Sequence, residues 1–195
     1  MTQRELILSS SSKARRELLQ RFNVPFTSVS PDIDETPKAD ETAEALVIRL
    51  AIEKAKAVSQ KYPKALIIGS DQVGTFEQHI LGKPLNLKNA IQQLQQRSGK
   101  TVRFLTGLCV LDAATNQYET TVATFDVTFR QLSLSDIEHY LQKEDALNCA
   151  GSLHIEGLGI ALTEKLEGDD YTSLIGLPMI RLTQMLKNAG LDVLK

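Results

Sequence analysis

The chain has 195 residues, of which 42% are hydrophobic and 24% are charged, and its formal net charge is −2. These values are typical of one generous globular domain or two small ones with a sizeable buried core. The near balance of charge excludes a nucleic-acid coat and a polybasic membrane surface, so local cations would have to bind any anionic substrate.

The cysteines and the first residues indicate the compartment. Cys109 and Cys149 have neither CxxC nor zinc-type spacing and lie in apolar or small-residue surroundings, so we expect reduced core thiols. The N-terminal segment has no long apolar run after a basic region, and no stretch approaches the roughly 18 apolar residues of a membrane span. We therefore expect a cytoplasmic protein that binds neither membrane nor nucleic acid.

The first third of the chain predicts alternating strands and helices. The periodicity favours strands over 5–10, 26–30 and 65–69, helices over 13–22 and 43–62, and a polar, acidic loop over 31–40. The second helix carries an apolar stripe at helical spacing, made of Val47, Leu50, Ala51, Ala55 and Val58. The continuous apolar run at 65–69 indicates a strand that is buried on both faces.

The remainder predicts a hairpin-rich middle and a closing helix. We expect a turn at 82–85, a helix over 87–97, strands over 101–111 and 118–130, an irregular stretch over 148–159 and a last helix from Pro178 to Gly190. The pattern Ser135-x-x-Glu138 predicts a capping box for a helix that runs to about Lys143.

Ser10-x-Ser12-x-x-Arg15 lies between a predicted strand and a predicted helix. Hydroxyls, free backbone N–H groups and a guanidinium at a helix N-terminus form a typical anion site. The alternative is an ordinary N-cap serine with solvated arginines. Neither the GxxxxGK[ST] pattern nor GxGxxG occurs, so the chain has no P-loop or dinucleotide fingerprint.

Two groups of carboxylates are candidates for metal binding and proton transfer. Asp34 and Glu35 lie in the acidic loop, where they could hold a hard divalent cation or form a solvated turn. Asp71, in Ser70-Asp71-Gln72, directly follows the predicted strand 65–69, and strand ends line the ligand crevice of open α/β sheets. Asp71 could therefore bind metal or deprotonate water, or simply cap a turn.

Two lysines and one glutamate complete the candidate residues. Lys54 lies beside the apolar stripe of its helix, either aimed into a phosphate site or snorkelling to water. Lys83 occupies the turn Gly82-Lys83-Pro84, and Glu156 lies between glycines; each could also be solvated. Together, candidate cations and carboxylates near strand ends suit a polyphosphate with a divalent cation. The three histidines, His154 among them, show no metal-binding spacing.

Several motifs, in order and over nearly the whole chain, resemble the Maf family, in particular its branch that acts on 7-methyl-GTP. They are LSSSSKARRELL, DETP, RLAIEKAKAV, IIGSDQV, GKPL, TFDVTFR, CAGSLHIEGLGI and IGLPMI. The resemblance implies an α/β fold with a central mixed twisted sheet flanked by helices. It also implies two lobes around a cleft, similar to inosine-triphosphate pyrophosphatases, within one domain over 1–195.

The resemblance also implies the reaction and residue roles. A nucleoside triphosphate is cut between its α and β phosphates with a divalent cation (Mg, Mn or Co), often by a homodimer. Asp71 matches the catalytic proton acceptor, and it shares the metal with Glu35. The positions that match substrate-binding residues are Ser10, Ser12, Arg15, Glu35, Lys54 and Lys83. The positions that match residues setting base preference are Ala14, Gln72 and Glu156.

The chain departs from the family pattern at the phosphate loop. Lys13 replaces a common proline, Ser9 a common alanine, and Ala14 stands where an arginine or a bulky aromatic is usual. Gln72 and Glu156 both favour the 7-methyl-GTP branch. The carboxylate of Glu156 also suits a positively charged base. Two alternatives remain: a dTTP/UTP pyrophosphatase of the same family, and a nucleotide-binding regulator of septation or cell division.

Overall fold

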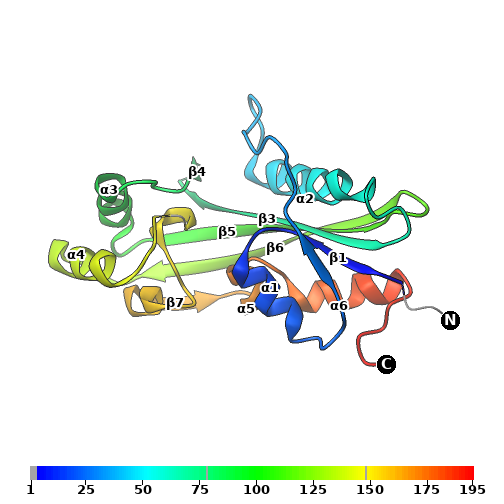
Figure 1. Ribbon diagram of the computed structural model, residues 1–195. Coiled ribbons are helices and arrows are strands. Elements are labelled where there is room, and N and C mark those ends of the chain that lie inside the picture. Colours follow the sequence, from blue (N-terminus) through cyan, green and yellow to red (C-terminus); the bar gives the residue numbers. More distant parts are fainter. Residues whose placement is uncertain (1–3, 78, 148) are drawn as a thin grey trace. The chain divides into compact units, whose positions relative to one another are not determined.

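The computed structural model describes residues 4–77, 79–147 and 149–195. Its strands pair in the order β2-β1-β3-β5-β6-β7, with β4 on β3, and helices flank the resulting mixed sheet (Figure 1). The α/β class expected from the sequence is therefore confirmed. No helix in the described ranges is long and apolar enough to cross a membrane.

The chain forms two compact units. The first contains Met1–Gln72, Thr106–Ala123 and Asp170–Lys195, and the second contains Val73–Leu105 and Thr124–Asp169. Three strands contribute residues to both units: β3 (Leu66–Phe76), β5 (Thr101–Asp112) and β6 (Gln117–Phe129). The single domain expected over 1–195 stays a prediction.

The first unit is a sheet with helices on both faces. It adds the strands β1 (Leu6–Ser9) and β2 (Thr27–Val29), and β1 pairs in parallel with both β2 and β3. Its helices are α1 (Lys13–Gln20), α2 (Ala43–Ser59), α5 (Tyr171–Ile175) and α6 (Met179–Asn188). Parallel strands buried on both faces explain the continuous apolar runs of β1 and β3.

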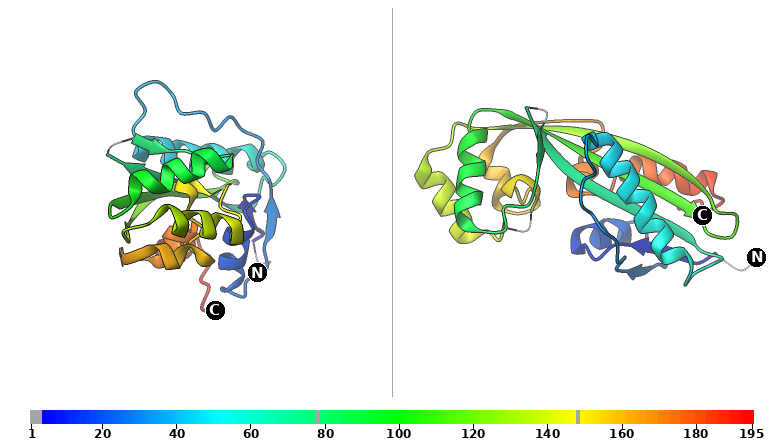
Figure 2. Two further views of the ribbon diagram at one scale, coloured as in Figure 1. Left: turned by 90° about the vertical axis from the view of Figure 1, so that its left-hand side faces the viewer. Right: turned by 90° about the horizontal axis from the view of Figure 1, so that it is seen from above.

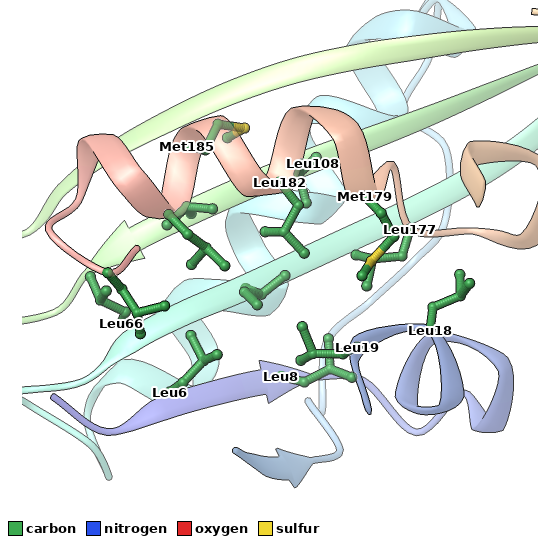
Figure 3. Close-up of a cluster of buried hydrophobic side chains, with 14 residues drawn as sticks. Leu6, Leu8, Leu18, Leu19, Leu66, Leu108, Leu177, Met179, Leu182 and Met185 are labelled. Atoms are coloured by element: carbon green, nitrogen blue, oxygen red, sulfur yellow. The ribbon is translucent and has the colours of Figure 1, made fainter. Parts of the chain in front are cut away.

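Alternating side chains divide the core of this unit between the two faces of the sheet. One face packs against α1 and α6; its members are Leu6, Leu8, Leu18, Leu19, Leu66, Ile68, Leu108, Val110, Leu177, Met179, Leu182, Met185, Leu186 and Leu191 (Figure 3). The other face packs against α2 through Ile7, Ala51, Ala55, Val58, Ala65, Ile67, Cys109 and Leu111. Cys109 is buried, and both cysteines are free, as expected.

Two glycines bring α2 unusually close to the sheet. A Cβ atom on Gly69 would lie 2.1 Å from the carbonyl oxygen of Ala51, and one on Gly107 would lie 2.2 Å from that of Val47. Real side-chain atoms cannot approach backbone so closely. The helix therefore rests directly on the backbone of β3 and β5, and this contact fixes the height of Lys54 above the sheet.

The second unit combines the other parts of β3, β5 and β6 with helices. Its elements are β4 (His79–Leu81), α3 (Leu87–Arg97), α4 (Leu134–Lys143), the short 3-10 helices η1 (Ala150–Ser152) and η2 (Leu158–Leu162), and β7 (Thr163–Glu167). Strand β4 pairs antiparallel with β3, and β7 pairs antiparallel with β6. Figure 2 shows α3 and α4 side by side, and their residues contact each other.

Two local predictions are wrong. The strand expected to end at Gly69 continues to Phe76, so Ser70, Asp71 and Gln72 lie inside β3 and not beyond its end. Their polar groups are tolerated there because neighbouring carbonyl and ammonium groups bind them, as described below.

The capping box of α4 is made by Ser133 and Asp136 instead of Ser135 and Glu138. The Ser133 hydroxyl accepts from the Asp136 N–H at 3.2 Å, and the Asp136 carboxylate accepts from the Ser133 N–H at 2.9 Å. The backbone is still extended at Ser133, so the helix begins one residue later, at Leu134. Of the stretch predicted to be irregular, Asn148 lies outside the described residues.

Candidate functional site

A buried lysine forms the centre of the candidate site in the first unit. Lys54 lies beside the apolar stripe of α2, and only 5% of this charged residue is exposed. Its Nζ donates to Asp71 Oδ1 at 2.6 Å and forms an ion pair with Glu35 Oε1 at 2.7 Å. The interpretation of Lys54 as a solvated, snorkelling side chain is therefore wrong: two carboxylates compensate its charge.

Arg15 adds a second cation to this group. Arg15 is half-buried, and burial lowers the pKa of its guanidinium, whereas the negative charges of Asp71 and Glu35 act in the opposite direction. An arginine stays charged despite such a shift. Two cations and two carboxylates from α1, the acidic loop, α2 and β3 thus meet in one place. We call these four residues, Arg15, Glu35, Lys54 and Asp71, the charge cluster.

The serines of the predicted phosphate loop shape the start of α1. Ser12 is the N-cap, and its hydroxyl accepts from the Arg15 N–H at 3.3 Å. The Ser10 hydroxyl accepts from the Ser12 N–H at 3.1 Å. The first N–H groups of a helix have no partner within the helix, so this end of α1 can bind an anion. Ala14 lies in this first turn and is partly exposed.

Gln72 is held from one side by backbone. Its Nε2 donates to the carbonyl oxygens of Ser173 at 2.7 Å and Leu174 at 2.9 Å, and lies 3.1 Å from Thr106 Oγ1. These carbonyls fix which end of the amide is nitrogen, because they only accept. Gln72 therefore has only its carbonyl oxygen left to offer a ligand, and that group is an acceptor.

The second unit contains the other two predicted site residues. Lys83 follows β4 in the turn before α3, and Glu156 lies between η1 and η2. Both interact electrostatically with Cys149, whose pKa burial raises to about 11. Glu156 raises this pKa further and Lys83 lowers it, so both charges act on the same thiol.

Glu156 belongs to a short chain of polar side chains that includes His154 and Glu144. Its Oε2 lies 3.7 Å from His154 Nε2, and His154 Nδ1 lies 2.6 Å from Glu144 Oε1. The Glu144 carboxylate also accepts from the Leu158 N–H at 2.6 Å, and these two hydrogen bonds hold its pKa below the usual range. The loop that carries Glu156 is therefore anchored to the end of α4.

Some of the polar residues that support the site were missed from the sequence. Thr106 and Asp170 are 1% and 7% exposed, and the carbonyl of Gly176 accepts from both Arg15 Nε at 2.8 Å and Ser70 Oγ at 2.9 Å. Aspartate is among the preferred N-cap residues, and this preference could have identified Asp170 as the start of α5. Nothing local in the sequence marks Thr106.

A cavity of about 840 Å³ also lies in the first unit, but none of the predicted site residues lines it. Its walls include Arg4, Phe22, Pro25, Leu191 and Lys195. The described residues contain no group of three or more His, Cys, Asp or Glu side chains that could hold a metal. Two carboxylates, Glu35 and Asp71, are the available anionic oxygen ligands of the charge cluster. This number suits a Mg²⁺-like ion that keeps waters and shares phosphate oxygens.

The fold and the charge cluster define an α/β protein with a mixed-charge site suited to an anionic ligand. A family model described as Maf-like protein matches residues 5–189. The 7-methyl-GTP pyrophosphatases of Colwellia psychrerythraea, Nitrosococcus oceani and Pseudomonas aeruginosa are 53%, 52% and 51% identical to the chain. Each match covers 97% of this chain and 94%, 95% and 98% of the relative. The protein belongs to the Maf family.

Among solved structures, the Staphylococcus aureus Ham1 protein is 15% identical, with a TM-score of 0.46 over 66% of this chain and 73% of that chain. The family assignment depends on the sequence matches alone.

Proposed function

We propose that this protein is a nucleoside triphosphate pyrophosphatase that hydrolyses 7-methyl-GTP to 7-methyl-GMP and pyrophosphate, a house-cleaning reaction against a modified nucleotide. The observation that carries the proposal is the charge cluster, in a chain whose relatives named 7-methyl-GTP pyrophosphatase are 51–53% identical over nearly its full length.

The buried contact between Lys54 and Asp71 supports a division of roles. Asp71 accepts a proton from a water molecule whose oxygen attacks the α-phosphorus. The bond from that phosphorus to the bridging oxygen breaks, and pyrophosphate leaves with the electron pair. Lys54 orients the carboxylate of Asp71, while Arg15 and the start of α1 bind phosphate oxygens.

The charge balance of the site supports a divalent cation. The two cations of the cluster already face two carboxylates, so an incoming triphosphate requires further positive charge. Glu35 and Asp71 would hold Mg²⁺, Mn²⁺ or Co²⁺, which would neutralise the phosphates and favour departure of pyrophosphate. Lys83 is expected to bind phosphate as well.

Gln72 and Glu156, the residues whose match to the family implies a role in base preference, are both acceptors, and this favours 7-methyl-GTP over dTTP or UTP. Gln72 has only its carbonyl oxygen to offer, and Glu156 carries a carboxylate; both suit a cationic purine that is rich in N–H donors. We also propose that the protein acts in the cytoplasm, binds no nucleic acid and forms a homodimer.

A pyrophosphate-release assay with Mg²⁺ or Mn²⁺ across 7-methyl-GTP, GTP, dTTP, UTP and inosine triphosphate tests the proposal. We expect the highest turnover with 7-methyl-GTP, and a loss of about 100-fold or more in Asp71→Asn. Asp112→Asn is the matched control, because that carboxylate pairs with Arg4 and lies outside the charge cluster. Orthophosphate as the first product contradicts the chemistry. Preferred turnover of a pyrimidine nucleotide contradicts the base assignment, and no turnover favours the binding regulator.

A further inference from the structure

Helix α5 directs its last carbonyl groups at three polar residues of the sheet and of α1. Gln72 donates to the carbonyls of Ser173 and Leu174, and Arg15 and Ser70 donate to that of Gly176. We call these three backbone carbonyls, of Ser173, Leu174 and Gly176, the carbonyl platform. The platform contacts Arg15, which is expected to bind phosphate, and Gln72, which is expected to set base preference. It also contacts Ser70, which precedes Asp71 in β3.

The platform fixes the direction of the Arg15 guanidinium. Its Nε is bound at 2.8 Å by Gly176, so the two terminal nitrogens remain for a phosphate. A Cβ atom on Gly176 would lie 3.2 Å from that Nε, and the residue has a φ of +119°, so only glycine fits without strain. Thr106 orients Gln72 similarly, because its hydroxyl donates to Ser173 at 2.8 Å.

One buried carboxylate ties the platform to the next helix. Asp170 Oδ1 accepts from the Thr172 N–H at 2.9 Å, and Oδ2 accepts from the Ile180 N–H of α6 at 2.9 Å. The Thr172 hydroxyl donates to Oδ1 of Asp170 and accepts from the Met179 N–H at 2.9 Å. A helix of five residues has few hydrogen bonds of its own, so these contacts hold it in place.

We propose that Asp170 is a positioning residue for phosphate binding: it locks α5 against α6 and thereby holds the carbonyl platform that orients Arg15 and Gln72. The inference rests on the proposed function, in which Arg15 binds the phosphates. Asp170 itself touches neither substrate nor metal. Its loss lets the platform move, and a displacement of about 1 Å in a phosphate-binding group can cost up to about 100-fold.

The test measures binding of inorganic tripolyphosphate to the purified protein by calorimetry, and KM and kcat for the nucleotide that it turns over fastest. We expect Asp170→Ala to weaken tripolyphosphate binding about 10-fold, to raise KM by a similar factor and to change kcat less. Asp170→Asn keeps the α5 cap, because asparagine caps as well as aspartate, but one of its two acceptors becomes a donor. It should show a smaller loss, and it provides a folded variant if Asp170→Ala does not fold.

Ser133→Ala is the matched control, because it removes an N-cap in the second unit whose hydroxyl bonds Asp136 in the first turn of α4. It should lower the thermal midpoint as an N-cap loss does, while tripolyphosphate binding stays within about twofold of wild type. The Arg15→Ala background separates positioning from general loosening. If Asp170 acts through Arg15, Asp170→Ala should weaken tripolyphosphate binding no further once Arg15 is gone.

Three results would overturn the inference: Asp170 variants that bind tripolyphosphate like the control, equal losses with and without Arg15, or no tripolyphosphate binding by the wild-type protein. Failure of the proposed function looks different. In that case no nucleotide is hydrolysed, while tripolyphosphate still binds and still depends on Asp170 through Arg15.

Discussion

Replacing Lys54 by methionine removes the cation shared by two carboxylates and keeps a side chain of similar size. Asp71 and Glu35 contact the same ammonium at 2.6 and 2.7 Å. Their nearest oxygens can therefore be at most about 5 Å apart, where two like charges repel by about 3 kcal/mol at an effective dielectric constant of about 20. Arg15 offsets part of this repulsion, and Glu35 can turn toward water because its side chain is 54% exposed.

Asp71 cannot turn away, because it is 8% exposed inside β3. We therefore expect Lys54→Met to lower the free energy of unfolding at pH 8 by about 2 kcal/mol. This is less than the roughly 3–5 kcal/mol of a broken buried pair, because Arg15 and the exposure of Glu35 offset part of the loss. For a chain of this length, that loss shifts the thermal midpoint by about 4 to 8 °C. The ratio kcat/KM should fall about 100-fold or more, because a preorganised hydrogen-bond donor is lost.

The assay is thermal and urea unfolding of wild type and variant between pH 8 and pH 4. An unpaired buried carboxylate disfavours folding while it is charged, so the difference should shrink as the pH falls and the carboxylate takes up a proton. Adding Asp71→Asn to Lys54→Met should recover part of the lost stability.

Lys56→Met, two residues further along α2 on its exposed face, is the control; its ammonium lies 4.9 Å from the Tyr118 ring centroid, an exposed contact worth about 0.5–1 kcal/mol. A loss in Lys54→Met no larger than in the control, or one independent of pH, would refute the buried charge cluster.

Three further results follow from the packing and the ion pairs. Gly107→Ala should cost about 3 kcal/mol, because the new Cβ would meet the Val47 carbonyl at 2.2 Å. Circular dichroism melting checks this against Gly82→Ala, where nothing lies within 4 Å of the new Cβ. Hydrogen bonds from Arg49 and the Lys38 N–H lower the pKa of Glu41 to about 2. This stabilisation is complete above the ordinary glutamate pKa and disappears as the pH falls toward 2, so wild type and Glu41→Gln should converge in urea unfolding over that range. Burial raises the pKa of Cys109 to about 12, so this thiol should resist a disulfide reagent at pH 8 until urea unfolds the protein; rapid labelling of native protein at Cys109 would contradict its buried position.

The regular elements were largely predictable, because their apolar patterns match the faces that they bury. Helix α3 begins and ends where its sequence predicts, and the stripe of α2 faces the sheet through Ala51, Ala55 and Val58. Strand β3 was cut short because Ser70, Asp71 and Gln72 look like a turn when their partners are unknown. Those partners, Lys54 and the carbonyl platform, come from distant parts of the chain.

The charge cluster could be assembled only in part from the sequence. The helical spacing placed Lys54 beside an apolar stripe, where a counter-charge was needed, but it could not say which carboxylate would supply it. Helix α5 escaped prediction because five residues give no periodicity, and its stability comes from Asp170 and Thr172. The roles of Lys83 and Glu156 remain predictions. Within the second unit, the structure shows only that both residues affect the pKa of Cys149.

The direct seating of α2 on Gly69 and Gly107 has a consequence for protein engineering. In most helix–sheet layers the side chains between the elements set the spacing, so a larger or smaller core residue moves the helix. Here two direct backbone contacts, at Gly69 and Gly107, set the spacing between helix and sheet. Changes of volume among core residues that face α1 and α6 should therefore alter stability while the distance from Lys54 to Asp71 stays constant. A designer could therefore change core residues on that side of the sheet without altering the distance from Lys54 to Asp71.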